Sequence, residues 1–189
     1  MRTIILASQS PFRKHALEIL GLEYEIMPSN IDESAIRHND PHTMARMLSE
    51  AKAIEIGKNQ KSATIIAADL FVVHQNKILE KPADIKEAKE MLHTLSGSKF
   101  DIVTGLAVYN SKTGKLLSSS DTCKVTFRKL LDLEIDDYIT RYPVTTVAGA
   151  FEADGLLRFA ERIEGNYNFK AALPVNKLIE FLRENDIKI

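Results

Sequence analysis

The stretch from Leu6 to Lys14 places hydroxyl groups and cations where an apolar run ends and a predicted helix begins. Ser10 suits the N-cap position of that helix, and Pro11 suits its first residue. Free N–H groups at a helix start, together with hydroxyls and cations, favour an anion, and phosphate fits best. The proposed phosphate ligands are Ser8, Ser10, Arg13 and Lys14. A helix start with a solvated basic face would give the same pattern.

The carboxylate of Asp69 is a second candidate, because it follows the apolar run Ile65–Ala68. A carboxylate at the C-terminal end of a buried strand commonly points into the ligand crevice of an α/β sheet. It could bind a hard divalent cation or orient a water for attack. A turn or N-cap role is the alternative, but no helix start follows, so the functional interpretation is favoured.

Three further charged residues are weaker candidates on local sequence. Glu33 follows Asp32 in a predicted loop, and two carboxylates could complete a Mg²⁺ site with phosphate oxygens. A solvated acidic loop is the more common outcome. Lys52 lies between two alanines of a predicted helix and could reach a cleft, and Lys81 precedes a proline and could reach a phosphate. Lysines at such positions are more often simply exposed.

Composition limits the classes of protein that the chain can represent. Its 189 residues, 44% of them hydrophobic, fit one domain over residues 1–189, with room for two lobes. The net charge of −1 gives no reason to expect a nucleic-acid polymer as partner. The single Cys123 excludes an intramolecular disulfide and fits a reducing compartment. With no apolar run long enough for a bilayer and a start directly in a strand, we expect a cytoplasmic protein without membrane contact.

Hydrophobic periodicity predicts alternating strands and helices in the first half and more strands in the second, hence an α/β fold with a mixed sheet. The predicted strands are 2–8, 24–27, 65–68, 71–73, 77–79, 100–109, 116–127 and 156–163. The predicted helices are 11–20, 41–56, 85–95, 133–141 and 175–184.

Short fragments spread over nearly the whole chain resemble, in their order, the Maf family. They are Ala7-Ser-Gln-Ser-Pro-x-Arg13, Glu50-Ala-Lys52-Ala53, Ala68-Asp69, Lys81-Pro82, Leu95-Ser-Gly97, Thr104, Ala148-Gly-Ala-Phe151, Gly155, Ile163-Glu-Gly165 and Leu173-Pro174. The resemblance implies a house-cleaning enzyme that splits a nucleoside triphosphate into the monophosphate and pyrophosphate. It also implies an elongated, two-lobed α/β fold around a central mixed β-sheet, similar to inosine-triphosphate pyrophosphatases, and a homodimer.

The resemblance also assigns roles to the charged candidates. The family's site positions match at Ser8, Arg13, Glu33, Lys52, Asp69 and Lys81. The implied catalytic set is Asp69, Glu33, Lys52 and Lys81. Asp69 would bind a divalent metal cation and activate water with help from Glu33, and the cations would hold the phosphates. The expected metal is Mg²⁺, with Mn²⁺ as an alternative.

The departures from the family pattern bear on the preferred base. Phe12 stands where many members have a second Arg, and Asp154 stands where the pyrimidine-preferring branch has Gln. Both resemble the branch acting on 7-methyl-GTP, whose cationic base could stack on Phe12 and be read by Asp154 or Glu152. Phe12 could instead pack under its helix, and Asp154 could cap a turn. Alternatives are a dTTP/UTP or broad-specificity pyrophosphatase and, in another class, a nucleotide-binding regulator of septum formation.

Overall fold

The computed structural model describes residues 3–166 and 168–189, except the side chains of Asp154, Asn168 and Phe169. Contacts between residues divide the chain into two compact units. Unit 1 comprises Met1–Asp69, Thr104–Asp121 and Tyr167–Ile189, and unit 2 comprises Leu70–Val103 and Thr122–Asn166. The assignment of residues 1–189 to a single domain stays a prediction.

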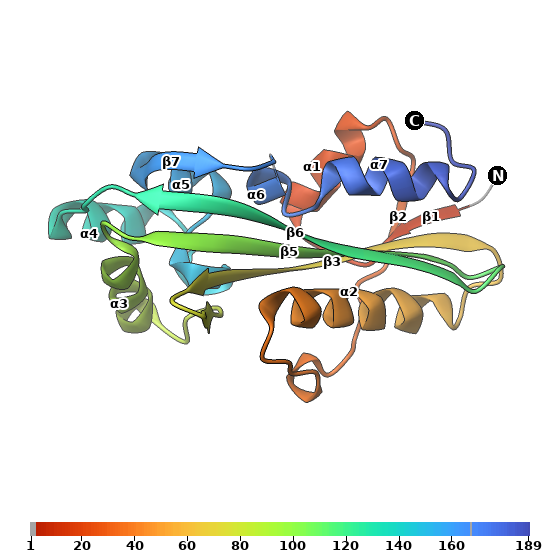
Figure 1. Cartoon of the computed structure of the whole chain (residues 1–189), viewed down its shortest axis with the longest axis horizontal. Helices are drawn as coiled ribbons and strands as arrows, with labels where there is room; N and C mark the ends of the chain where they lie inside the picture. Colours follow the sequence, from red (N-terminus) through yellow and green to blue (C-terminus); the bar gives the residue numbers. More distant parts are fainter. Residues whose placement is uncertain (1–2, 167) are drawn as a thin grey trace. The chain divides into compact units, whose positions relative to one another are not determined.

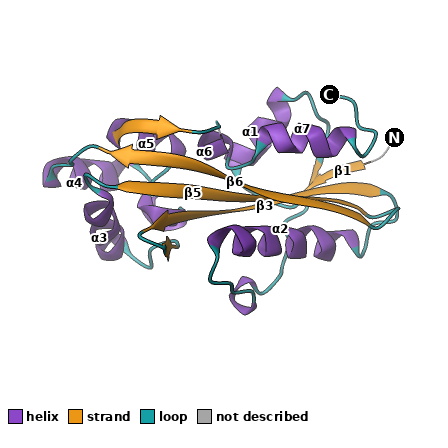
Figure 2. Cartoon of the chain, viewed as in Figure 1, coloured by secondary structure: helices purple, strands orange, loops and turns teal. Residues whose placement is uncertain are grey.

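The described residues form an α/β fold with a central mixed sheet, as the sequence predicted (Figure 2). The strands are β1 (Thr3–Leu6), β2 (Glu25–Ile26), β3 (Ala63–His74), β4 (Lys77–Leu79), β5 (Lys99–Asn110), β6 (Lys115–Phe127) and β7 (Ala160–Glu164). The α-helices are α1 (Pro11–Ile19), α2 (Pro41–Gly57), α3 (Ile85–Leu95), α4 (Asp132–Arg141), α5 (Ala153–Phe159), α6 (Asn168–Ala171) and α7 (Val175–Arg183). Short 3₁₀ turns are η1 (Glu33–Ala35), η2 (Val144–Thr146) and η3 (Ala148–Ala150).

Unit 1 sandwiches its part of the sheet between helices. The strand order is β2-β1-β3-β5-β6, and β1 runs parallel to both β2 and β3. Helix α2 covers one face, where Ala53 packs on Ile5 and Ile65. Helices α1 and α7 cover the other face (Figure 1). In this arrangement the charged residues come from the first turn of α1, the interior of α2 and the interior of β3.

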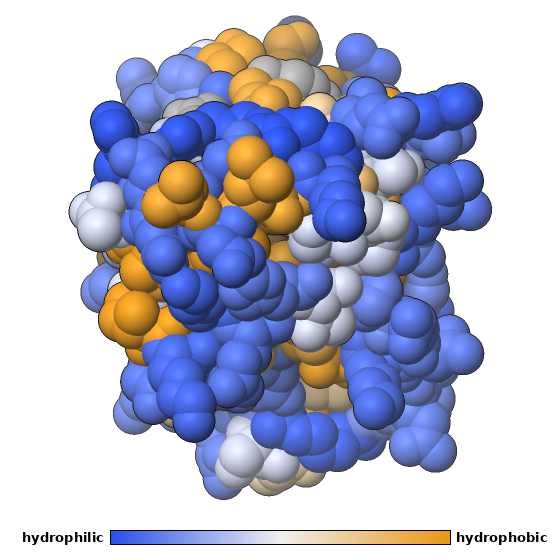
Figure 3. Space-filling model, turned by 90° about the vertical axis from the view of Figure 1, so that its left-hand side faces the viewer, coloured by the Kyte–Doolittle hydropathy of each residue, from blue (hydrophilic) through white to orange (hydrophobic). Residues whose placement is uncertain are grey.

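Unit 2 continues the long strands and adds β4 beside β3 and β7 beside β6, both antiparallel. Its core is aromatic. Phe127 lies against Phe100, Phe151 and Phe159, with ring centroids 4.8 to 5.6 Å apart. Figure 3, viewed from the side on which α4 lies, shows hydrophobic residues scattered among hydrophilic ones. The large exposed hydrophobic residues of this unit are Ile85, Leu131, Leu133 and Leu157.

Two sequence-based expectations about unit 2 were wrong. The stretch 156–163, predicted as a strand, is helix α5 followed by strand β7. Leu156 and Phe159 are fully buried and Leu157 is exposed, and a spacing of three residues suits one face of a helix. Strand β3 also does not stop before Asp69, because the apolar residues 71–73 carry it on to His74.

In the part of the chain that the structure describes, none of the helices is long and apolar enough to cross a membrane.

Candidate active site

The centre of the candidate site is an ion pair between α2 and β3. Lys52 Nζ lies 2.6 Å from Asp69 Oδ1, and the two side chains are only 9% and 13% exposed. Asp69 alternates with Ala67 and Ile65 along β3, so its side chain points to the same face as theirs, which α2 covers. The Asp69 carboxylate therefore lies within a strand and under a helix, and not at a free strand end.

Glu33 joins this ion pair from the segment between β2 and α2. Its Oε1 lies 3.0 Å from Lys52 Nζ, and its side chain is 56% exposed. Asp32 caps the 3₁₀ turn η1 by accepting a hydrogen bond from the Ser34 amide at 3.0 Å. Arg37 then donates from Nη1 to the carbonyl oxygen of Glu33 at 2.7 Å. These local bonds fix the turn that presents Glu33 to Lys52.

Arg13 reaches the same cluster from the first turn of α1. Its Nε donates to the carbonyl oxygen of Ala172 at 2.9 Å, and its Nη1 donates to Ser8 Oγ at 3.1 Å. Ser8 is buried and also accepts a hydrogen bond from the Ser10 amide at 3.2 Å. Ser10 Oγ accepts from the Arg13 amide at 3.5 Å, as its predicted N-cap role requires. The guanidinium is thus aimed by two anchored bonds and keeps donors to spare.

The position of Lys52 depends on a close approach between α2 and β5. A Cβ at Gly105 of β5 would lie 2.2 Å from the carbonyl oxygen of Ala45 in α2. A Cβ at Gly57, at the other end of α2, would lie 2.4 Å from the ring of Tyr109 in β5. Only glycine fits at either place, so the two contacts hold the helix against the sheet on both sides of Lys52.

The charged residues of the cluster shift one another's pKa values. Burial raises the pKa of Asp69, while the charges of Lys52 and Arg13 act to lower it. Burial likewise lowers the pKa of Arg13, and the charges of Asp69 and Glu33 oppose that shift. These reciprocal effects show that the four residues form one cluster. A carboxylate with a raised pKa is a better proton acceptor near neutral pH than an ordinary surface carboxylate.

The cluster contains ligands suited to a hard cation. Asp69 and Glu33 each place an oxygen within 3.0 Å of the same Lys52 nitrogen, so the two carboxylates converge on one point. Mg²⁺ commonly takes one or two carboxylates and completes its shell with phosphate oxygens and water. Among the described residues no group of three His, Cys, Asp or Glu side chains could hold a metal. Asp69 and Glu33 could supply two carboxylates to a cation that also binds phosphate oxygens.

The structure brings Ser8, Ser10, Arg13, Glu33, Lys52 and Asp69 into unit 1. Lys14 follows Arg13 on α1 and is partly exposed, and its carbonyl oxygen accepts a hydrogen bond from Tyr24. Lys81 is an exposed residue of unit 2, between β4 and α3.

The three base-recognition candidates do not fall in one unit. Phe12 is a half-buried residue of α1 in unit 1. Glu152 is the N-cap residue of α5 in unit 2, and its amide donates to Tyr138 Oη at 2.9 Å. The side chain of Asp154 lies outside the described residues. The structure therefore does not test the three as a set.

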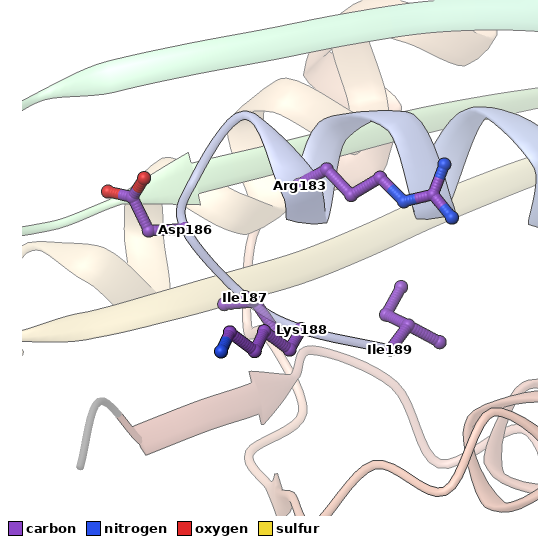
Figure 4. Close-up of a pocket in the computed structure, with 5 residues that line it drawn as sticks. All are labelled: Arg183, Asp186, Ile187, Lys188 and Ile189. Atoms are coloured by element: carbon purple, nitrogen blue, oxygen red, sulfur yellow. The ribbon is translucent and has the colours of Figure 1, made fainter.

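An open hollow in unit 1 is separate from these candidates. It lies at the C-terminal end of α7 and is lined by Arg183, Asp186, Ile187, Lys188 and Ile189 (Figure 4). None of these residues was predicted to take part in the site. Figure 4 shows the Arg183 side chain pointing back along α7, away from Asp186.

Sequence reasoning missed three positions that support the site. Gly105 could have been noticed, because a glycine inside a predicted strand often marks a close backbone approach. Arg37 and the carbonyl oxygen of Ala172 carried no such signal. Their role follows only from the hydrogen bonds to the turn of Glu33 and to Arg13.

Comparison with known proteins identifies the class to which this fold and site belong. The family of Maf-like proteins matches residues 3–185, and the chain belongs to that family. A dTTP/UTP pyrophosphatase from Aquifex aeolicus (strain VF5) is 37% identical over 182 residues, covering 96% of this chain and 94% of that protein. A dTTP/UTP pyrophosphatase from Bacillus cereus (strain G9842) is 33% identical over 190 residues, covering 100% of this chain and 98% of that protein.

A solved structure supports the fold class independently. The structure of a HAM1 protein from Coxiella burnetii matches with a TM-score of 0.52 at 14% identity, covering 97% of this chain and 100% of that chain. At this identity the likeness shows the fold alone, and it confirms the predicted α/β architecture.

Proposed function

We propose that this protein hydrolyses nucleoside triphosphates to the monophosphate and pyrophosphate, with dTTP and UTP as its substrates. The observation that carries the proposal is the cluster of Lys52, Asp69, Glu33 and Arg13 in a chain of this family. The buried Lys52 and the half-buried Arg13 can hold phosphates, and two converging carboxylates can bind a metal and accept a proton from water. The names of the two relatives, both dTTP/UTP pyrophosphatases, support the same activity.

The reaction assigns each residue a task. Arg13 and Lys52 bind phosphate oxygens, and Ser8 keeps Arg13 aimed at them. The phosphate-binding role of Lys81, an exposed residue of unit 2, stays a prediction. A water molecule attacks the α-phosphorus and transfers a proton to Asp69 or Glu33, whose order of action stays open. The bond between the α-phosphorus and the bridging oxygen breaks, and pyrophosphate leaves with its negative charge balanced by the cations.

A divalent metal cation, Mg²⁺ or Mn²⁺, fits the same residues. Asp69 and Glu33 would hold it together with phosphate oxygens of the substrate. Such a metal supplies charge neutralisation to the triphosphate and lowers the pKa of bound water.

The preferred base is the finer part of the proposal. Phe12, Asp154 and Glu152 led the sequence analysis to 7-methyl-GTP. The two named relatives favour the pyrimidine alternative, so dTTP and UTP take first place. Homodimer formation and a cytoplasmic location stay predictions.

Pyrophosphate release with Mg²⁺ from a panel of nucleotides tests the proposal. The panel is dTTP, UTP, 5-methyl-UTP, 7-methyl-GTP, GTP and ITP, and the Asp69→Asn variant controls for contaminating phosphatases. We expect dTTP and UTP to turn over fastest. A sharp preference for 7-methyl-GTP would restore Phe12 and Asp154 as base readers. No turnover of any member would favour the nucleotide-binding regulator instead.

A further inference from the structure

Lys52 contacts the two oxygens that are the best candidates for metal ligands. Its Nζ lies 2.6 Å from Asp69 Oδ1 and 3.0 Å from Glu33 Oε1. An ammonium group in that place neutralises the carboxylates and occupies the point on which they converge. A divalent cation needs the same oxygens at about 2.0–2.1 Å if it is Mg²⁺. The ammonium and the metal therefore cannot hold both oxygens in these positions at once.

Helix α2 cannot relieve this conflict by moving. Gly105 lies against the backbone of Ala45, and Gly57 lies against the ring of Tyr109, so the helix is fixed on both sides of Lys52. Ala53, next to Lys52, is fully buried against the sheet. The Lys52 side chain can turn away without any movement of the helix, and a buried ammonium does so at low cost only when another anion receives it.

The charges of the cluster decide what that anion must be. Lys52 and Arg13 balance Asp69 and Glu33. A metal ion alone would add two positive charges beside the buried Lys52 and the half-buried Arg13, which low-dielectric surroundings make unfavourable. A triphosphate brings enough negative charge to receive Lys52 and to neutralise the metal.

From this geometry we infer that Lys52 excludes a free divalent cation from the Asp69–Glu33 pair, so that the metal enters only together with the triphosphate. The inference deepens the proposed function and rests on it for the identity of the triphosphate. The exchange is reciprocal. The Lys52 ammonium would pair with phosphate oxygens in place of the carboxylates, and the carboxylates would bind the metal in place of the ammonium.

Binding of Mn²⁺ alone tests the inference, by titration calorimetry or by the paramagnetic resonance signal of free Mn²⁺. The comparison is between the wild-type protein and Lys52→Gln, without nucleotide. We expect Lys52→Gln to bind Mn²⁺ about tenfold more tightly or better, because a nearby positive charge is gone and both carboxylates are released. Lys52→Arg, which keeps the charge, should bind Mn²⁺ as weakly as the wild type.

Two control variants locate the effect. Lys86→Gln removes the same charge from an exposed lysine and should leave Mn²⁺ affinity at the wild-type value. Lys52→Gln combined with Asp69→Asn should lose the gained affinity, because the metal ligand itself is gone. Equal Mn²⁺ affinity of the wild type and Lys52→Gln overturns the inference, whether both bind tightly or both weakly.

A measurement on the wild type keeps the test sharp if Lys52→Gln does not fold. Mn²⁺ affinity should rise at least about tenfold when a dTTP analogue with a non-hydrolysable α–β bridge is present. Tight Mn²⁺ binding without the analogue would overturn the inference. Neither measurement uses turnover, so the failure of the inference and the failure of the proposed function can be told apart. The proposed function fails if the wild type releases no pyrophosphate although Lys52→Gln binds Mn²⁺ more tightly than the wild type does.

Discussion

The two units differ in what they bury beside their aliphatic side chains. Unit 1 buries the pair Lys52 and Asp69 beneath α2, whereas unit 2 buries a group of aromatic rings around Phe127. Buried ion pairs rarely stabilise a fold more than apolar residues of similar size would, because both charges lose their hydration. Buried aromatic rings contribute large apolar areas and favourable edge contacts. The charged interior is therefore explained by chemistry, and the aromatic interior by stability.

The sharpest test of this contrast removes one charge from unit 1. Asp69→Asn should lower the rate of pyrophosphate release by about a hundredfold or more, because a proton acceptor and metal ligand is lost. The amide oxygen can still accept a hydrogen bond from Lys52, which also keeps its ion pair with Glu33. We expect unfolding free energy within about 1 kcal/mol of wild type. Normal turnover by this variant would contradict the role of Asp69.

The matching substitution in unit 2 is Phe127→Ala. Phe127 is 1% exposed and contacts three other rings, so its truncation should lower the unfolding free energy by about 3–5 kcal/mol. Denaturant unfolding measures the loss. The folded fraction should keep the wild-type turnover per molecule in a pyrophosphate-release assay. A large loss of turnover in fully folded protein would break the division between the two interiors.

A smaller effect is expected from removing the hydroxyl group of Tyr138. Tyr138 is fully buried, its Oη accepts a hydrogen bond from the Glu152 amide at 2.9 Å, and burial raises its pKa well above the usual value. Tyr138→Phe should cost about 1 kcal/mol of unfolding free energy, the usual value of one hydrogen bond. Chemical denaturation should resolve it. A loss of unfolding free energy as large as that of Phe127→Ala would mean that the hydroxyl makes stabilising contacts besides its hydrogen bond with the Glu152 amide.

The smallest effect concerns a partly exposed ion pair of unit 2. Arg128 donates two hydrogen bonds to Glu134, at 2.8 and 2.6 Å, and these lower the pKa of Glu134 to about 2. A carboxyl with a lowered pKa stabilises the fold above its unfolded pKa of 4.5, and that contribution is lost as the pH falls towards 2. The melting temperature of the wild type should exceed that of Glu134→Gln at pH 6, and the gap should narrow below pH 4.5 and close near pH 2. A difference in melting temperature that does not depend on pH would contradict the stabilising role of the ionised Glu134 carboxylate.

Local patterns predicted much of the site. Ser10 and Pro11 marked the start of α1, and the family resemblance pointed to Glu33, Lys52 and Asp69. Local chemistry alone treated Lys52 as an ordinary surface lysine, because nothing in its neighbours along the chain shows which strand the helix covers. The spacing of Leu156 and Phe159 was misread as a strand, since four or five residues cannot separate a short helix from a strand by period alone.

The sequence by itself determined the kinds of element, the first turn of α1 and the set of charged residues available for chemistry. These depend on interactions within a few residues, which neighbouring side chains largely decide. Tertiary structure decided that Lys52 pairs with both Asp69 and Glu33, that Gly105 lets α2 approach the sheet, and that Ala172 anchors Arg13. Those contacts join residues 17 to 159 positions apart, and only the folded backbone brings them together.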